Sequence, residues 1–348
     1  MNNRRENIFQ LGYTLLCRKK SEFFVLGIIV FISFGFLGRL AFSENTKEVS
    51  LTPVIEQVSP KEVMPEFQED KEVKLLFVGD IMFDRYIRQM AMKDGYDVLL
   101  ENSKNVLLDS DGVIGNLEGP ITENVSRSIG SAVGSRDNYF FTFDKEIAGV
   151  LKRYNFKALH LGNNHILNFG QEGYESTVSY LNRIGIVSFG GGGSERESGV
   201  EEIHGISFAF VSYNAFGSFG DAETVDAISR LREQADYVIV LAHWGEEYRV
   251  RSNPVQQELG HAFVDAGADL VIGSHPHVVQ EMEIYKGKRI YYSLGNFVFD
   301  QYFSQDVRKG LVVEVGIHGH ESDFRFQEYD AFMTPDGKTT IKTKVSQK

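Results

Sequence analysis

Residues 74–80 read Lys74-Leu-Leu-Phe-Val-Gly-Asp80, a short apolar run that ends in a glycine and a carboxylate. A run of this length and composition is typical of a strand buried on both faces. Four more apolar runs end in the same way, in polar or metal-binding side chains. They are residues 112–116 before Glu118, 158–161 before 163–165, 237–242 before His243, and 269–272 before His275 and His277. The pattern predicts buried strands with chemically active carboxyl ends.

The segments between these runs have apolar residues at helical spacing. They are residues 145–154, 173–184, 222–234 and 255–266, and further strands are predicted at 186–189, 206–213, 289–298 and 310–315. Helices that alternate with strands imply right-handed crossovers and covered sheets, while the strand-rich end suggests antiparallel additions. With 42% hydrophobic residues and only 7 prolines, the composition is that of a packed domain rather than a disordered chain. The predicted class is α/β, with two sheets packed together between helices.

The carboxyl ends of strands in an open α/β sheet line its ligand crevice, so the polar strand ends are expected to converge. The candidate residues are Asp80, Asn116, Glu118, Asn163, Asn164, His165, His243, His275 and His277. Individually some have simpler interpretations: Asp80 could cap a helix near residue 85, and the two adjacent asparagines could occupy a turn. A His-x-His pair directly after an apolar strand is harder to explain by packing, because buried imidazole nitrogens need partners. We therefore expect metal ligation there.

The metal would have nitrogen and oxygen ligands only. The one cysteine, Cys17, precedes the apolar segment near the N-terminus, so no thiolate is available to the folded region. Imidazole and oxygen ligands suit Mn, Fe, Zn or Mg, and one or two such ions could polarise a phosphoryl oxygen or activate a water. The formal net charge of −12 argues against nucleic acid as a partner.

The N-terminal region is expected to be a targeting or membrane-anchoring segment rather than part of the folded domain. Residues 23–42 form a run of twenty that is broken by a single charge, Arg39, and are preceded by Arg18, Lys19 and Lys20. This predicts a cytoplasmic tail (1–22), a single-pass membrane anchor (23–42) and a stalk (43–72), with the domain outside the cell. A cleaved signal peptide is the alternative, although the apolar run is long for one. The folded domain is expected over residues 73–325, with a C-terminal tail at 326–348.

Six motifs occur in an order that resembles the poly-γ-glutamate capsule biosynthesis protein CapA family, also called PgsA. They are Gly79-Asp-Ile-Met82, Asn116-Leu-Glu-Gly-Pro120, Gly162-Asn-Asn-His165, His243-Trp-Gly-Glu-Glu-Tyr248, Gly273-Ser-His-Pro-His277 and Ser293-Leu-Gly-Asn-Phe297. The match runs from about residue 74 to residue 300. That family resembles the calcineurin-like metallophosphoesterases, which implies a four-layer α/β/β/α sandwich with a dinuclear site.

The resemblance also implies a role for each matching residue. Asp80 would be a ligand of the first metal, Glu118 or Asn116 would bridge, and Asn164, His243, His275 and His277 would complete the coordination. His165 would be the general acid. Residues 293–296, including Ser293 and Asn296, would shape the pocket floor. Apart from the resemblance, Trp244, Glu246 and Tyr248 lie beside His243 in the sequence and could line a substrate groove, although aromatic residues after a strand are as often part of the core.

Two positions depart from the expected pattern. Metallophosphoesterases usually have a histidine two residues after the first Asp, whereas this chain has Met82, a poor ligand for a hard metal. This predicts that one metal site is weakened. The Asn-Asn-His motif is commonly followed by an aspartate, and here Asn168 removes a charge that could orient His165.

Two functions remain open at this point. The first is a non-catalytic membrane component that assists synthesis, export or anchoring of an anionic poly-γ-glutamate capsule, together with other membrane proteins of that system. The second is an extracellular metal-dependent hydrolase of a phosphoester or an amide-linked polymer, in which His165 protonates the leaving group.

Overall fold

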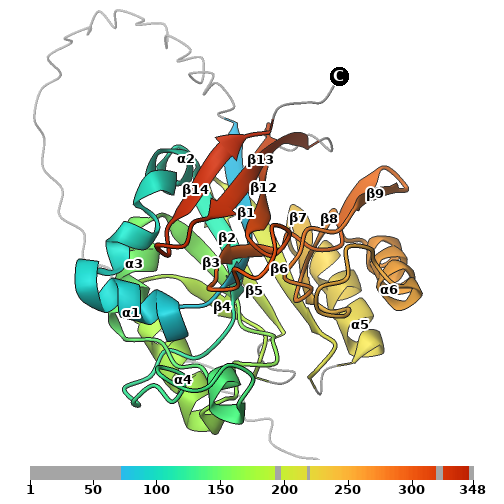
Figure 1. Ribbon diagram of the computed structural model, residues 1–348. Helices are drawn as coiled ribbons and strands as arrows, with labels where there is room; N and C mark the ends of the chain where they lie inside the picture. Colours follow the sequence, from blue (N-terminus) through green and yellow to red (C-terminus); the bar gives the residue numbers. More distant parts are fainter. Residues whose placement is uncertain (1–71, 193–196, 218–219, 319–323, 345–348) are drawn as a thin grey trace, which may run out of the picture. The chain divides into compact units, whose positions relative to one another are not determined.

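The structure, a computed structural model, describes residues 72–192, 197–217, 220–318 and 324–344 and contains two mixed β-sheets (Figure 1). In the first sheet the strand order is β14 (Thr339–Thr343), β13 (Arg325–Met333), β12 (Lys309–Ile317), β1 (Val73–Ile81), β2 (Gly112–Leu117), β3 (Phe156–His160) and β4 (Val187–Phe189), and β11 (Asn296–Val298) also pairs with β1. In the second the order is β5 (Ser198–Ile203), β6 (Ile206–Asn214), β7 (Tyr237–His243), β8 (Leu270–Ser274), β10 (Lys288–Tyr291) and β9 (Met282–Tyr285).

In the part of the chain that the structure describes, six α-helices connect these strands. They are α1 (Arg85–Asp94), α2 (Lys104–Leu108), α3 (Glu146–Arg153), α4 (Gly170–Arg183), α5 (Asp221–Arg232) and α6 (Pro254–Asp265), with short 3₁₀ turns at Tyr96–Leu99, Glu101–Ser103 and Arg136–Tyr139. The central strands of each sheet are parallel: β1 to β4 in the first, and β6, β7, β8 and β10 in the second. The predicted α/β class with two sheets is confirmed.

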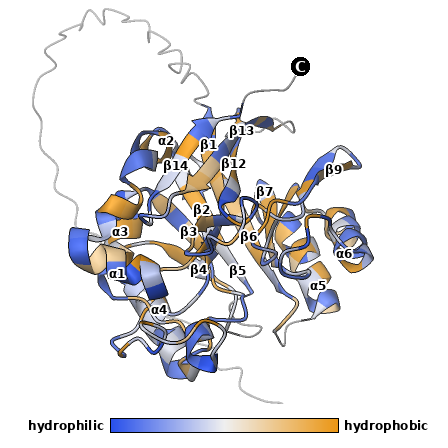
Figure 2. Cartoon of the chain, viewed as in Figure 1, coloured by the Kyte–Doolittle hydropathy of each residue, from blue (hydrophilic) through white to orange (hydrophobic). Residues whose placement is uncertain are grey.

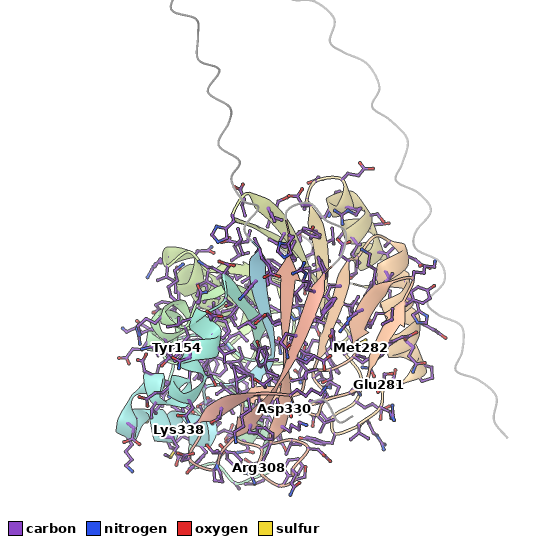
Figure 3. The ribbon with its side chains drawn as sticks, turned by 90° about the horizontal axis from the view of Figure 1, so that it is seen from above. Tyr154, Glu281, Met282, Arg308, Asp330 and Lys338 are labelled. Atoms are coloured by element: carbon purple, nitrogen blue, oxygen red, sulfur yellow. The ribbon has the colours of Figure 1, made fainter. Side chains whose placement is uncertain are left out.

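Among the described residues, three buried apolar clusters hold the sheets and helices together. Alternate residues of a buried strand point to opposite faces, so one strand contributes to two clusters. In β7, Ile239 and Leu241 pack between the two sheets, whereas Val238 and Val240 pack against α5 and α6. The other face of the first sheet packs against α1, α3 and α4. Hydrophobic residues accordingly concentrate in the strands (Figure 2). Seen from above (Figure 3), Tyr154 after α3 and Met282 of β9 lie on opposite sides of the central strands.

Two predictions about the C-terminal half are wrong. Residues 289–298 do not form one strand: β10 ends at Tyr291 in the second sheet, and β11 begins at Asn296 beside β1 in the first. The predicted C-terminal tail does not begin at residue 326, because β13 and β14 complete the first sheet as far as Thr343. Ala331, Met333 and Ile341 from these strands are buried in its apolar cluster.

The predicted cytoplasmic tail (1–22), membrane anchor (23–42) and stalk (43–72) lie outside the described residues, apart from Glu72. Among the helices that are described, none is both long enough and apolar enough to cross a bilayer.

Candidate metal centre

Strand register brings the predicted site residues to one place. Asp80 of β1 lies opposite Asn116 of β2 and opposite Asn296 of β11. In the second sheet, His243 ends β7 opposite Ser274 of β8. The parallel strands all present their carboxyl ends to the same edge, as the sequence pattern requires. Side chains that are far apart in the sequence therefore lie close together in space.

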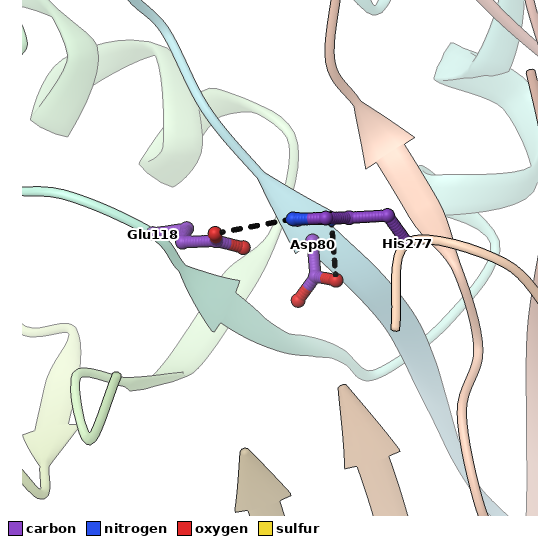
Figure 4. Close-up of side chains that lie close together, drawn as sticks. All are labelled: Asp80, Glu118 and His277. Atoms are coloured by element: carbon purple, nitrogen blue, oxygen red, sulfur yellow. Dashed lines mark ion pairs between the residues drawn. The ribbon is translucent and has the colours of Figure 1, made fainter. Parts of the chain in front are cut away.

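Asp80, Glu118 and His277 form a buried cluster (Figure 4). One potential ligand atom from each residue lies within 4.8 Å of the others. His277 Nδ1 is 3.3 Å from Asp80 Oδ2, and its Nε2 is 3.6 Å from Glu118 Oε1. The two carboxylates are fully buried and His277 is 3% exposed. Two carboxylates and one imidazole are a ligand set that suits a divalent cation.

The electrostatics of the cluster also favour a cation. Burial raises the pKa of Glu118 well above its usual range. Burial alone would lower the pKa of His277, but the carboxylates of Glu118 and Asp80 outweigh it and raise this pKa to about 9. The cluster therefore retains protons near neutral pH, and metal binding would release them. Both carboxylate oxygens of Glu118 are buried without a hydrogen-bond partner among the described residues, which fits a group that binds a metal.

A second group of polar side chains surrounds this cluster. Asn116 Nδ2 donates to Asp80 Oδ1 at 2.8 Å and lies 3.3 Å from His243 Nδ1. His243 Nε2 is 2.9 Å from Asn164 Oδ1. His275 donates its backbone N–H to Asp80 Oδ2 at 3.1 Å, while its ring Nδ1 is buried without a partner in the described part of the chain.

Both histidines of this second group are uncharged at neutral pH. Burial lowers the pKa of His275 to about 4 and that of His243 well below its usual range. Neutral imidazole is the form that binds metals. The structure therefore brings the seven predicted ligands into one region, and among the acidic and histidine side chains of the described residues Asp80, Glu118 and His277 lie close enough to share one ion.

His165 stands at the edge of the cluster. Its Nε2 is 3.8 Å from Glu118 Oε1, and its Nδ1 is 3.3 Å from Oδ1 of Asn168, the residue that departs from the family pattern. Burial lowers the pKa of His165 to about 4. At neutral pH such an imidazole is uncharged and lacks the extra proton that a general acid donates, so a general-acid role stays a prediction.

Two of the residues predicted to contact substrate, Trp244 and Glu246, make their side-chain contacts outside the cluster. Trp244 does not line a groove: it is 1% exposed, stacks with Phe263 and donates its indole N–H to the Tyr292 carbonyl at 2.9 Å. The expectation failed because Trp244 directly follows β7 and continues its helix-facing side. Glu246 is exposed and pairs with Arg249.

Tyr248, Ser293 and Asn296 are closer to the predicted roles. Tyr248 is 41% exposed, and its ring centroid is 6.1 Å from that of His277. Asn296 Oδ1 is 2.9 Å from His277 Nδ1 and orients that ring. Ser293 is buried and accepts a hydrogen bond from the Gly295 N–H at 3.1 Å.

The alternative interpretation of Asp80 as a helix cap is wrong. Asp84 caps α1 by accepting from the Arg85 N–H, while Asp80 belongs to β1. Sequence reasoning also missed two neighbours of the cluster. The charge of Glu247 acts on Glu118, His275 and His277 as a minor contribution beside burial, and its place in the motif at 243–248 was a usable signal. The ring centroid of Phe216 is 4.4 Å from that of His275, a contact without any local sequence signal.

Comparisons with known proteins agree on one family. The family described as "Bacterial capsule synthesis protein PGA_cap" matches residues 74–301. The PGA biosynthesis protein CapA of Bacillus subtilis is 32% identical over 263 residues, which cover 70% of this chain and 67% of that protein. The capsule biosynthesis protein CapA of Bacillus anthracis is 30% identical over 266 residues, 70% of this chain and 64% of that protein.

A solved structure is similar at a lower level. The purple acid phosphatase from yellow lupin seeds has a TM-score of 0.38 and 10% identity, and the match covers 80% of this chain and 55% of that protein. This likeness is too remote to support an inference about activity. The family match includes every predicted metal ligand and extends over most of the described domain. The chain therefore belongs to the bacterial capsule synthesis protein PGA_cap family.

Proposed function

We propose that this chain is a membrane-anchored, extracellular component of poly-γ-glutamate capsule synthesis, export or anchoring, and that it binds the anionic polymer at a divalent metal. Family membership supports the capsule role, as do the printed names of the two Bacillus relatives. The apolar run at residues 23–42 supports the anchor. Other membrane proteins of capsule synthesis are the proposed partners.

The observation that carries the metal-binding part is the state of Glu118. A buried carboxylate without hydrogen-bond partners is costly unless a cation compensates it. Asp80 and His277 are placed to share that cation, with Asn116, Asn164, His243 and His275 available to a second one. Mn, Fe, Zn and Mg all suit these ligands. Such an ion would supply positive charge for a carboxylate or phosphoryl oxygen of the ligand.

A metal-dependent hydrolase of a phosphoester or amide-linked polymer is the second candidate. The position of His165 beside Glu118 favours it, because a proton-transfer group next to a metal site is a hydrolase feature. A calcineurin-like sandwich with a dinuclear site would fit this activity. In this proposal His165 exchanges a proton with the reacting group, while Asn168 holds its ring through Nδ1.

Glu118→Gln tests the metal centre. The purified full-length chain should bind at least one transition metal, and Glu118→Gln should weaken binding at least about ten-fold, because a neutral amide replaces an ionised ligand. Elemental analysis and metal titration by calorimetry would measure this. Glu123→Gln is the matched control, since Glu123 is an exposed carboxylate that pairs with Lys145. Less than one bound metal per wild-type chain would contradict the metal site.

Two further measurements separate the candidate functions. Cells that lack the chain should lose surface γ-glutamate polymer, and the wild type but not Glu118→Gln should restore it. The purified chain should show no turnover of γ-glutamyl oligomers or phosphoesters if it only binds. Turnover that disappears with a chelator and in His275→Ala would instead establish the hydrolase.

A further inference from the structure

Arg85 has an unusual backbone next to the metal centre. It is the first residue of α1 and has φ of 50°, a left-handed conformation that is costly for a residue with a side chain. Its N–H is held by Asp84 Oδ1 at 2.9 Å and by Ser128 Oγ at 3.3 Å. His275, His277 and Tyr248 share this left-handed backbone. Strain of this kind persists where the surrounding structure needs a side chain in one position.

The guanidinium of Arg85 is enclosed but incompletely paired. Its central carbon is 5.0 Å from the ring centroid of Phe141 and 5.4 Å from that of Phe299. One terminal nitrogen donates to Asp300, and the side chain is 12% exposed. Its Nε, however, is buried and has no hydrogen-bond partner among the described residues. A guanidinium presents its donors as a rigid fork suited to carboxylates and phosphates.

Arg88, one turn further along α1, shows how a structural arginine is paired. Its Nε donates to Asp144 at 3.1 Å, Nη1 donates to the Thr142 carbonyl at 3.1 Å, and Nη2 also donates to Asp144. All three nitrogens therefore have partners. A purely structural role, in which Asp300 tethers α1, accounts for one nitrogen of Arg85 and leaves its Nε unexplained.

The two aromatic rings that hold Arg85 also touch the metal centre. The ring centroid of Phe141 is 4.3 Å from that of His165, and the centroid of Phe299 is 4.7 Å from that of His277. The charge of Arg85 acts on Glu118 and on His165, although no ion pair joins it to Glu118. A fixed positive charge thus stands beside the cluster in a chain whose net charge is −12.

We propose that Arg85 is the anion-binding residue of this centre and that its guanidinium binds a carboxylate or phosphate oxygen of the ligand. The inference rests on the proposed function in one respect, namely that the ligand is an anion held near the metal. An incoming oxyanion would satisfy the unpaired Nε with a charge-assisted hydrogen bond. The positive charge of Arg85 would also attract it in a chain that is acidic as a whole. Arg85 thereby selects for anionic ligands.

The test compares anion binding by Arg85→Met, Arg85→Lys and the wild type, each as the full-length chain in detergent. Calorimetric titrations use two probes, a γ-glutamyl trimer and inorganic phosphate, with and without saturating Mn²⁺. We expect Arg85→Met to weaken binding of the recognised anion at least about ten-fold, because a buried charged donor is removed. Arg85→Lys should give a smaller loss, since it keeps the charge without the fork.

Arg127→Met is the matched control, because Arg127 also lies over an aromatic ring, that of Phe140, and pairs with an acid, Asp137, but is half-exposed. It should bind both probes as the wild type does. If Arg85→Met does not fold, Arg85→Lys decides by its loss of affinity. Wild-type-like anion binding by the Arg85 variants, or no binding of either probe by the wild type, would overturn the proposal.

The titrations with and without Mn²⁺ also test this inference separately from the proposed metal site. Arg85-dependent anion binding without any Mn²⁺ binding supports the inference while the metal proposal fails. Normal Mn²⁺ binding together with anion binding that does not depend on Arg85 would support the metal site and contradict the role of Arg85. Preference for the trimer over phosphate identifies the polymer carboxylate as the anion source, and the opposite preference identifies a phosphoryl group.

Discussion

His160 shows that not every buried histidine near the centre is a ligand. It is the last residue of β3, fully buried, and its Nε2 is 2.8 Å from Ser212 Oγ in the other sheet. Its Nδ1 has no hydrogen-bond partner in the described part of the chain. Burial lowers its pKa to about 3, and the charge of Asp80 offsets this only in part. His160 is therefore neutral over the physiological range and serves packing.

We predict that His160 makes the protein sensitive to acid. Its folded pKa lies below its unfolded value of about 6.5, so the unfolded chain binds the proton first. The stability that neutral His160 contributes is present above that value and is lost as pH falls toward about 3, at up to about 1.4 kcal/mol per pH unit. His160→Gln, which keeps a partner for Ser212, should lose about 2 kcal/mol less than the wild type between pH 7 and pH 5.

Urea unfolding of the full-length chain at the two pH values would measure this difference. Other buried histidines add to the acid sensitivity of both proteins equally, so only the difference between them reports on His160. Equal losses in the wild type and in His160→Gln would show that this side chain is not buried in its neutral form.

The connection between β10 and β11 explains why two positions of the sequence motifs are glycine. It crosses from the second sheet to the first, and its backbone lies directly against Gly79 of β1 and Gly273 of β8. A Cβ atom on Gly79 would lie 1.8 Å from the Gly295 carbonyl oxygen, and one on Gly273 would lie 1.9 Å from the Tyr292 carbonyl oxygen. Both glycines therefore allow a close backbone approach. Each lies one or two residues before a predicted metal ligand.

We predict that Gly79→Ala destabilises the protein by about 3 kcal/mol or more, because the clash is with backbone that cannot move aside as a side chain would. Asp80 would shift with β1, so metal affinity should fall as well. Thermal unfolding and metal titration would measure both effects. Gly149→Ala is the control: it lies in α3 with only the far end of Arg153 near its Cβ position, and it should stabilise by up to about 1 kcal/mol. A Gly79→Ala variant as stable as the wild type would contradict this account of the crossing.

At the scale of the whole molecule, the chain beyond residue 324 completes the fold. Strand β13 pairs with β12 over most of its length, and β14 closes that side of the sheet. Thr339 is fully buried and donates its hydroxyl to the Phe297 carbonyl of β11, next to the site. The last strands thus support both the core and the position of Asn296.

We predict that a chain ending at residue 324 does not fold stably. Loss of β13 and β14 would expose the apolar cluster of the first sheet and leave β12 as a long unpaired edge strand, which promotes aggregation. The lost burial would be a large share of the ~5–15 kcal/mol by which domains are normally stable. Soluble yield and size-exclusion chromatography would test this, with a chain ending at Lys344 as the control. A monomeric, cooperatively folded 1–324 product would refute the boundary given by β14.

The order of apolar runs in the sequence was enough to predict the α/β class and the strand ends that carry Asp80, Glu118, His243, His275 and His277. These are local properties, because burial of a strand on both faces imposes an apolar run and the active edge follows from parallel pairing. Motif order likewise identified the family without any coordinates.

Only the tertiary structure decided which of these residues form the compact cluster. Asp80 and His277 are almost two hundred positions apart, and their meeting depends on how two sheets pack, which no local pattern records. The same long-range packing buried Trp244, split residues 289–298 between two sheets and drew residues 326–343 into the first sheet. It also placed Arg85 against Phe141 and Phe299, whose rings touch His165 and His277. Local periodicity determined the elements, and contacts between distant segments determined the site.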